Sequence, residues 1–390
     1  MEQKNLVPKR RFKEFQNASA WEQRAVSELA DRYDNFRIPI TASNRVAGST
    51  PYYGANGIQD YVEGFTHDGE FILVAEDGAN DLQNYPVHYV NGKVWVNNHA
   101  HVLQAKSEIA DNKFLMNAMK YMNIEPYLVG GGRSKLNADV MMKISLRVPE
   151  LAEQKLIGSF FASLDHLITL HQRKLEKMKA LKSAYLSEMF PAEGEYVPKR
   201  RFAGFTQAWE QRKLGEVVDV YDGTHQTPKY MKEGIMFLSV ENIKTLQSEK
   251  YISEEAFRNE FKIRPEKGDV LMTRIGDIGT AKVVETGDPI AYYVSLALLK
   301  PKKINPYFLQ ACIHSSSVQG EIWKRTLHIA FPKKINKNEI EKVLIDFPSD
   351  EEQAKIGDFF KQLEDNITLH QRKLKKLQNI KKAYLNEMFV

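Results

Sequence analysis

The sequence predicts a mixed α+β and α/β protein in which two globular regions are joined by two long antiparallel coiled-coil helices. Three observations predict this fold. A 42-residue segment with helical periodicity occurs twice, at residues 149–190 and 348–389. A short basic box also occurs twice, and the regions between the repeats contain strand-like apolar runs separated by glycine turns. The chain is therefore expected to be a pseudo-two-fold internal repeat.

The two helical segments align without a gap, and 24 of their 42 positions are identical. Their apolar residues recur at alternating steps of four and three, which is the a/d seam of a coiled coil. The seam positions are Ile157, Phe161, Leu164, Ile168, Leu175, Met178, Tyr185 and Met189 in the first copy, and Ile356, Phe360, Leu363, Ile367, Leu374, Leu377, Tyr384 and Met388 in the second. Polar residues interrupt both copies at the same two places, His171 and Lys182, and His370 and Lys381. Because a polar seam residue fixes register, these four are predicted register residues.

Helices of this length need a partner to cover an apolar stripe. The box at residues 7–24 recurs at 197–212, so the chain order is box, region, helix, linker, box, region, helix. Such an order forms a ring of two members if the chain termini are close, and its two-fold symmetry makes the helices antiparallel partners. The alternative interpretation is that each helix lies only on its own domain.

The predicted domains follow directly from this order. They are residues 1–148 (a globular region with the box at 7–24), 149–190 (the first helix), 191–212 (linker and repeated box), 213–347 (a second globular region) and 348–390 (the second helix).

The two globular regions differ in sequence but share one type of pattern. In the first, residues 69–80 predict a strand, and residues 86–105 predict strands with an Asn-Gly turn at Asn91 and Gly92. In the second, residues 234–243, 268–285 and 291–301 predict strands with glycine turns, and a helix is expected near 305–322. Both regions are therefore predicted to be twisted sheets with a few helices.

Composition excludes several classes of protein. No apolar run reaches the roughly 18 residues of a membrane span, and residues 1–12 lack the apolar core of a signal peptide, so we expect a cytoplasmic protein. The only cysteine, Cys312, rules out an internal disulfide and is expected to be buried. The net charge of +5 permits a polyanionic partner without requiring one.

Catalytic motifs are absent from the sequence. It has no Asn-Pro-Pro-aromatic motif of a DNA methyltransferase and no GxxxxGK[ST] phosphate loop. The triplet Glu153-Gln154-Lys155 resembles a nuclease motif, but its copy reads Glu352-Gln353-Ala354, so we interpret both as the first turn of a helix. His171 is interpreted as a seam residue and not as a general base or a metal ligand. We therefore predict no catalytic residue, no metal site and no cofactor bound by this chain.

The candidate contact groups for a nucleic acid lie in the globular regions. Asn, His, Arg and Lys at glycine-rich turns are the side chains that read base edges, although each taken alone is more often a turn former or a solvated charge. The candidates in the first region are Asn80, Lys93, Asn97, Asn98, His99, His101, Arg133, Ser134 and Lys135. Those in the second are Thr224, His225, Thr227, Lys229, Arg274, Asp277, Lys324, Arg325 and His328.

These features together resemble a known family. Unlike regions joined by near-identical long helices, each entered through a P-x-x-x-E-Q turn (149–154 and 348–353), resemble the specificity (S) subunit of type I restriction-modification systems. The segments ITLHQRKL, PKRRF, PYYGANGIQDY, AEDGAN, WVNNHAHV and GDVLMTRIGDIG are similar to that family's patterns. The resemblance covers essentially the whole chain.

The resemblance implies a specific function. The two regions would be target recognition domains that each read one half of a split sequence in double-stranded DNA, and the coiled coil would set the unread spacer. Two methyltransferase (M) subunits would use S-adenosylmethionine to modify adenine at N6, and two restriction (R) subunits would use ATP and Mg²⁺. The S subunit itself would catalyse nothing. The alternatives are a stand-alone bipartite DNA-binding regulator and a coiled-coil adaptor.

Overall fold

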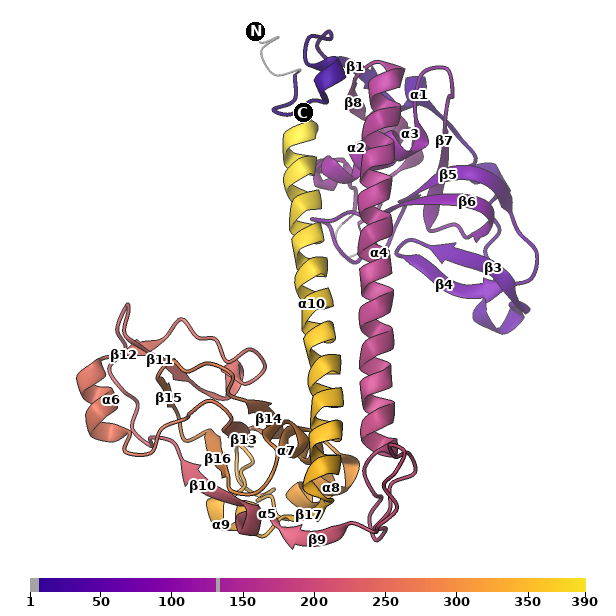
Figure 1. Ribbon diagram of the computed structural model, residues 1–390. Helices are drawn as coiled ribbons and strands as arrows, with labels where there is room; N and C mark the ends of the chain where they lie inside the picture. Colours follow the sequence, from indigo (N-terminus) through magenta and orange to yellow (C-terminus); the bar gives the residue numbers. More distant parts are fainter. Residues whose placement is uncertain (1–6, 131–133) are drawn as a thin grey trace. The chain divides into compact units, whose positions relative to one another are not determined.

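The computed structural model describes residues 7–130 and 134–390. The chain divides into two compact units, which are residues 1–172 with 372–390 (unit 1) and residues 173–371 (unit 2). The long helices α4 (Leu151–Glu188) and α10 (Asp350–Met388) match the two predicted helical segments, and each contributes to both units (Figure 1).

The helices are antiparallel in unit 1. The first part of α4 packs against the last part of α10, with ring centroids of Phe160 and Tyr384 5.1 Å apart. Lys381 Nζ lies 2.5 Å from Asp165 Oδ1. Residues further along α4 thus contact residues nearer the start of α10, so the two helices are antiparallel, as the chain order predicted.

Unit 2 repeats this arrangement with the roles of the helices exchanged. The ring centroids of Tyr185 and Phe359 are 5.0 Å apart, and Lys182 Nζ lies 2.5 Å from Glu364 Oε2. Adding the offset of 199 residues to Asp165 and Lys182 gives Glu364 and Lys381, so the two ion pairs are copies of each other. The interpretation that each helix packs only on its own domain is therefore wrong.

Burial along the helices follows the predicted seam. The most buried seam residues are Ile157, Phe161, Leu164, Leu175, Met189, Ile356, Phe360, Ile367 and Met388, each at most 9% exposed. The predicted register residues His171 and His370 are half-buried, as are Lys182 and Lys381. A helix–helix contact in each unit thus has an apolar seam that contains polar members.

Unit 1 contains a six-stranded sheet in the order β2-β7-β5-β6-β3-β4. Its strands are β2 (Ala30–Arg32), β3 (Ala47–Gly54), β4 (Gly57–Val62), β5 (His67–Ala75), β6 (Val87–Val96) and β7 (Ala100–Ala105). All neighbours are antiparallel except β3 and β6, which are parallel. The helices are α1 (Val26–Leu29), α2 (Asn112–Tyr121) and α3 (Ala138–Lys143), with short 3-10 turns η1 (Lys13–Phe15), η2 (Asp34–Phe36), η3 (Ala42–Asn44) and η4 (Glu125–Tyr127). Phe114 and Leu115 of α2 share a core with Phe161 of α4 and Phe389.

The predicted Asn-Gly turn in this region is wrong. Asn91 and Gly92 lie within β6, which pairs with β5 from His67↔Val94 to Val74↔Val87. Gly92 has a φ of 92° and faces Gly69, which has a φ of 142°. Two facing glycines can adopt this local twist without ending the ladder, whereas the sequence pattern alone indicated a chain reversal.

Unit 2 contains two larger sheets besides a two-stranded pair. One has the order β10-β16-β13-β14 and the other β12-β11-β15. The strands are β10 (Val218–Asp222), β11 (Ile235–Leu238), β12 (Tyr251–Ile252), β13 (Val270–Ile275), β14 (Asp277–Val283), β15 (Ile290–Tyr292) and β16 (Leu296–Pro301). The helices are α5 (Leu214–Val217), α6 (Glu254–Glu260), α7 (Pro306–Ile313), α8 (Ser316–Lys324) and α9 (Lys337–Glu341), with the turn η5 (Val240–Asn242).

The helix expected near residues 305–322 is two helices. The chain breaks at Ser315, whose hydroxyl accepts a hydrogen bond from the backbone N–H of Val318 and so caps α8. Cys312 of α7 is fully buried, as predicted for a small apolar side chain.

The repeated box closes each globular region onto its helix. Residues of the first box form β1 (Glu22–Ala25), which pairs with β8 (Ser145–Val148) immediately before α4. Residues of the second form β9 (Glu210–Lys213), which pairs with β17 (Leu344–Phe347) immediately before α10. The start and the end of each globular region therefore meet beside the start of a long helix.

A buried ion pair fixes the start of each long helix. Arg11 donates to both carboxylate oxygens of Glu153, at 2.9 and 2.5 Å, and Glu153 is 1% exposed. In the second copy Arg201 donates to Glu352 at 2.6 and 2.7 Å, and the indole N–H of Trp209 donates to the same carboxylate at 3.1 Å. The Glu-x-Lys resemblance to a nuclease is thus explained by a structural role for the glutamate.

The glutamine that follows each of these glutamates hydrogen-bonds the helix to the globular region. The Gln154 amide donates to the carbonyl of Pro149 and accepts from the backbone N–H of Asp111, just before α2. A Cβ on Gly158 would lie 2.4 Å from Asp111 Oδ1 and 2.9 Å from the backbone N of Phe114. Only glycine therefore lets the N-terminus of α2 approach α4 this closely.

The buried carboxylate should dominate the stability of each unit. Glu352→Ala leaves the Arg201 guanidinium without its carboxylate, and breaking a buried pair costs about 3–5 kcal/mol. Chemical denaturation followed by circular dichroism should show this loss. The control is Glu254→Ala, which breaks the exposed Arg258 pair and should change stability by less than about 0.5 kcal/mol. Equal effects of the two variants would contradict a special role for Glu352.

Candidate nucleic-acid interface

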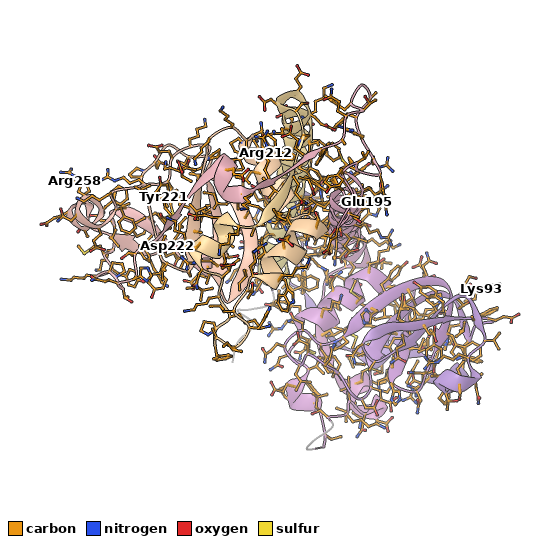
Figure 2. The ribbon with its side chains drawn as sticks, turned by 90° about the horizontal axis from the view of Figure 1, so that it is seen from below. Lys93, Glu195, Arg212, Tyr221, Asp222 and Arg258 are labelled. Atoms are coloured by element: carbon orange, nitrogen blue, oxygen red, sulfur yellow. The ribbon has the colours of Figure 1, made fainter. Side chains whose placement is uncertain are left out.

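The predicted contact residues of unit 1 fall into separate places. Lys93 lies on β6 opposite Asp68, exposed at the periphery of the unit, with Nζ 4.7 Å from the Phe65 ring centroid (Figure 2). The other candidates that the structure describes lie near the end of β5 and the start of β7. Of these, Asn80, Asn98 and Lys135 are exposed, whereas His99 and Ser134 are half-buried. Arg133 lies outside the described residues.

Two predicted contact residues of unit 1 lie in the interior. Asn97 is 4% exposed, and its side-chain oxygen accepts from the backbone N–H of His99 at 2.8 Å. His101 is 1% exposed, with Nδ1 2.7 Å from Asp34 and Nε2 2.8 Å from the carbonyl of Leu136. Contact of either side chain with DNA would require these bonds to break. Asn97 thus caps the bend between β6 and β7.

A charged network surrounds His101. Glu76 pairs with Arg37 at 2.6 Å and with Lys135 at 2.9 Å. Burial by itself raises the pKa values of Glu76 and Asp34. Hydrogen bonds from Arg37 and Lys135 to Glu76, and from His101 to Asp34, outweigh burial and lower both pKa values. Both carboxylates therefore remain ionised at neutral pH.

The same network contains a group of possible metal ligands among the described residues. Ligand atoms of Asp34, Glu76 and His101 lie within 4.8 Å of one another. The cations Arg37 and Lys135 already balance the carboxylates, and both His101 nitrogens have partners. A divalent ion would have to displace these contacts, so the donor set fits an internal ion-pair network better than a metal site.

Unit 2 brings its predicted residues to one edge of the four-stranded sheet. Arg274, at the end of β13, is 6% exposed and forms an ion pair with Asp222 at the end of β10 (Figure 2). Its Nε donates to the carbonyl of Ile335 at 3.1 Å. The loop after β10 carries Thr224, which is half-buried, and His225, Thr227 and Lys229, which are exposed, while Asp277 is exposed at the tip of the β13–β14 turn. Arg274 is thus internal and connects segments that carry exposed candidates.

The remaining candidates of unit 2 lie at the end of α8. Lys324 pairs with Glu193 of the linker, and Arg325 pairs with Glu321 at 3.0 Å. His328 is exposed, and its Nε2 lies 3.0 Å from the carbonyl of Trp323. Lys324 and Arg325 thus already have ion-pair partners at the surface, and His328 contacts a backbone carbonyl.

The edges of the two units are built alike. In unit 1 the backbone N–H of Leu136 donates to the backbone carbonyl of Glu76, and the Leu136 carbonyl lies 2.8 Å from His101 Nε2. In unit 2 the backbone N–H of Ile335 donates to the backbone carbonyl of Arg274, and the Ile335 carbonyl accepts from the Arg274 side chain. Leu136 and Ile335 are matching repeat positions, 199 residues apart. In each unit a buried side chain of the sheet thus anchors the loop that precedes the final short helix.

Sequence reasoning missed the residues that organise these edges. Asp34, Arg37 and Glu76 come from separated segments, and no local motif joins them. It also missed the exposed apolar residues of the loop 327–334, because a single sequence does not show which apolar side chains are exposed. The match of Lys135 with Lys334 in the repeat was the available signal for this loop.

Comparison with known proteins decides the family. The model described as "Type I restriction modification DNA specificity domain" matches residues 18–180 and again residues 206–379. The chain belongs to this family. The predicted family is thus confirmed, and the two matches correspond to two recognition domains.

Similar proteins have related names. A Haemophilus influenzae protein named as a type I restriction enzyme specificity subunit is 43% identical over 146 residues, which are 37% of this chain and 38% of that protein. The MjaVIII specificity subunit of Methanocaldococcus jannaschii is 21% identical, over 73% of this chain and 71% of that protein. The S subunit structure from M. genitalium matches with a TM-score of 0.75 and 15% identity, covering 98% of this chain and 99% of that one. This last likeness confirms the fold. In the described part of this specificity-family chain, no helix has the length and apolar character needed to cross a bilayer.

Interior and exposed candidates should respond differently to substitution. Lys229→Gln tests the predicted contact of this exposed lysine: loss of one phosphate contact should weaken DNA binding and lower the salt slope by about one, while stability should stay unchanged. Arg274→Ala should instead lower the free energy of unfolding by about 1–3 kcal/mol, because it leaves the buried Ile335 carbonyl without the hydrogen bond from the guanidinium. Binding isotherms at several salt concentrations and denaturation curves measure the two effects.

The matched control for Lys229 is Lys267→Gln, an exposed lysine before β13 and so at the opposite end of that strand from Arg274. It should leave the salt slope unchanged. If Lys267→Gln and Lys229→Gln reduced binding equally, the edge would not be the contact surface.

Proposed function

We propose that this chain is the non-catalytic specificity subunit of a type I restriction-modification complex. Each recognition domain reads one half of a bipartite sequence in double-stranded DNA. The paired helices α4 and α10 set the number of unread base pairs between the halves. The main support for this proposal is that both units have such an edge. In each, a buried side chain holds the carbonyl at one repeat position, Leu136 or Ile335, while the exposed side chains differ.

The exposed side chains support this assignment. Asn98 and Lys135 in unit 1, and His225 and Lys229 in unit 2, offer hydrogen-bond donors and positive charge at the two edges. Such groups bind base edges and phosphates, and two unlike sets of them can read two unlike half-sites.

The partners follow from the family. Two M subunits bind S-adenosylmethionine and methylate adenine at N6, and two R subunits use ATP and Mg²⁺ for translocation and cleavage. This chain supplies no catalytic residue and binds no cofactor of its own. A stand-alone regulator would bind the same DNA without a methyltransferase, and an adaptor would not bind DNA. Co-purification with an M subunit and a mobility-shift assay separate the three functions.

An exchange of one recognition domain tests modular reading. Residues 25–148 are replaced by the corresponding region of another family member, and methylome sequencing of cells that express the chimaera with its M subunit gives the new target. One half of the motif should change and the other half should stay, because each half is read by one domain. A change in both halves would count against modular reading.

The spacer test lengthens the helices. One heptad inserted after Gln172 and one after Gln371 keeps the seam in register and adds about 10 Å to the helix pair. This corresponds to about three base pairs of B-DNA, so the spacer should lengthen by that number while both half-sites keep their bases.

A heptad in one helix alone is the comparison, and it should lengthen the spacer or abolish recognition. Methylome sequencing reads out both variants. An unchanged spacer in the doubly extended protein would refute the role of the helices as a ruler.

A further inference from the structure

An unusual apolar tip projects from the contact edge of unit 2. It comprises residues 329–332, between α8 and α9, and we call it the apolar tip. Ile329 is 99% and Phe331 103% exposed, whereas the next most exposed large apolar side chain among the described residues, Val46, is 61% exposed. Two large apolar side chains that contact almost nothing within their own unit are costly in water, so they indicate a binding role.

The base of the apolar tip is firmly held. The backbone N–H of Leu327 donates to the carbonyl of Lys334 at 2.8 Å, and that of Gly276 donates to Lys333 at 2.9 Å. Arg274 fixes the next residue through its hydrogen bond to the Ile335 carbonyl. The tip is therefore a projection supported by the sheet edge and not a frayed chain end.

Positive charge surrounds the apolar tip. Lys333 and Lys334 follow it directly, and neither pairs with a carboxylate of the residues that the structure describes. Lys333 Nζ lies 4.6 Å from the Trp323 ring centroid, and the His328 ring lies 4.2 Å from the same indole. An apolar point flanked by free cations is complementary to a stack of bases flanked by phosphates.

We propose that Ile329 and Phe331 form a wedge that inserts between base pairs of the half-site read by the second recognition domain. The inference rests on the proposed DNA-reading function and adds a means of recognition to it. Apolar wedges of Phe, Ile, Leu, Met or Pro partly unstack a base step and kink the duplex. The energy needed to unstack depends on the step, so the wedge contributes specificity without a hydrogen bond to a base.

The wedge has no counterpart in the first copy of the repeat. By sequence, the loop closed by Val129 and Lys135 has glycine at 130–132, where the loop closed by Leu327 and Lys334, which is one residue longer, has Ile329 and Phe331. Glycine offers no side chain to insert. The distortion is therefore confined to one half-site, which provides an internal control in the same DNA molecule.

The test uses the full chain co-purified with its M subunit and duplexes that carry the motif found by methylome sequencing. The domain exchange described above assigns each half-site to a recognition domain. The fluorescent base 2-aminopurine replaces, one at a time, purines of both half-sites other than the methylated adenine. Wild-type protein should raise the fluorescence at one step of the second half-site, because an unstacked 2-aminopurine is brighter, and at none of the first.

The variant Ile329→Ala/Phe331→Ala should lose this signal and bind the motif about tenfold more weakly, and the exposure of both side chains means that stability should not change. Phe331→Leu should retain most of the signal because leucine is also an effective wedge. The control Ile263→Ala, which truncates another exposed apolar side chain of unit 2, should behave as wild type.

Three results would overturn the wedge. They are normal binding by wild type without a fluorescent step in the second half-site, an unchanged signal in the double variant, and loss of the co-purified M subunit from the double variant, which would make the tip a protein contact. Failure of the wild-type complex to bind its motif would instead overturn the proposed function, and the wedge with it.

Discussion

The buried contact between an arginine of the box and a glutamate in the first turn of each long helix underlies the rest of the architecture. Arg11 with Glu153, and Arg201 with Glu352, join the segment before a recognition region to the helix after it. Two hydrogen bonds in each pair offset the loss of hydration, although Arg201 Nη1 has no partner among the described residues, and they hold the two residues in one geometry. Glutamine and glycine then set the approach of α2 and α7 to the same helices, since Gly357 lies against Asn305 as Gly158 lies against Asp111. The first turns of each long helix thus hold a recognition domain in a fixed position on that helix.

A second constraint acts on the loops at the contact edges. His101 and Arg274 were candidates for base contact, yet both are buried and hold the carbonyls of Leu136 and Ile335. The sheet thereby fixes the base of each loop, while the exposed residues of the loop can vary without disturbing it. Specificity and stability are in this way assigned to different side chains a few residues apart.

The extent to which sequence predicts this structure differs between its levels. The long helices, their antiparallel pairing and the repeat were predictable because the helical period and the 24 shared positions are dense local signals. The Asn91-Gly92 turn was mispredicted because the local preference of Asn-Gly for a hairpin was overridden by continuous pairing with β5. The break at Ser315 follows from a local cap at Val318 that the apolar pattern did not indicate, whereas the interior position of His101 depends on long-range contacts with Asp34 and Leu136. The exposure of the apolar tip was likewise not predictable from the sequence, because an Ile-Ala-Phe run most often indicates buried core.

The repeat gives two recognition domains one common framework, as the proposed reading of two different half-sites requires. Identity between the copies is concentrated in the helices and boxes, where Lys182 with Glu364 and Lys381 with Asp165 repeat the same register. The edges have diverged to the point that one loop carries three glycines where the other carries Ile329, Ala330 and Phe331. A substitution in the framework removes an ion pair that holds a helix and so lowers stability, whereas one in a loop alters only the surface that it presents. Under the proposed function, recognition can change one domain at a time, because these ion pairs involve none of the candidate contact residues.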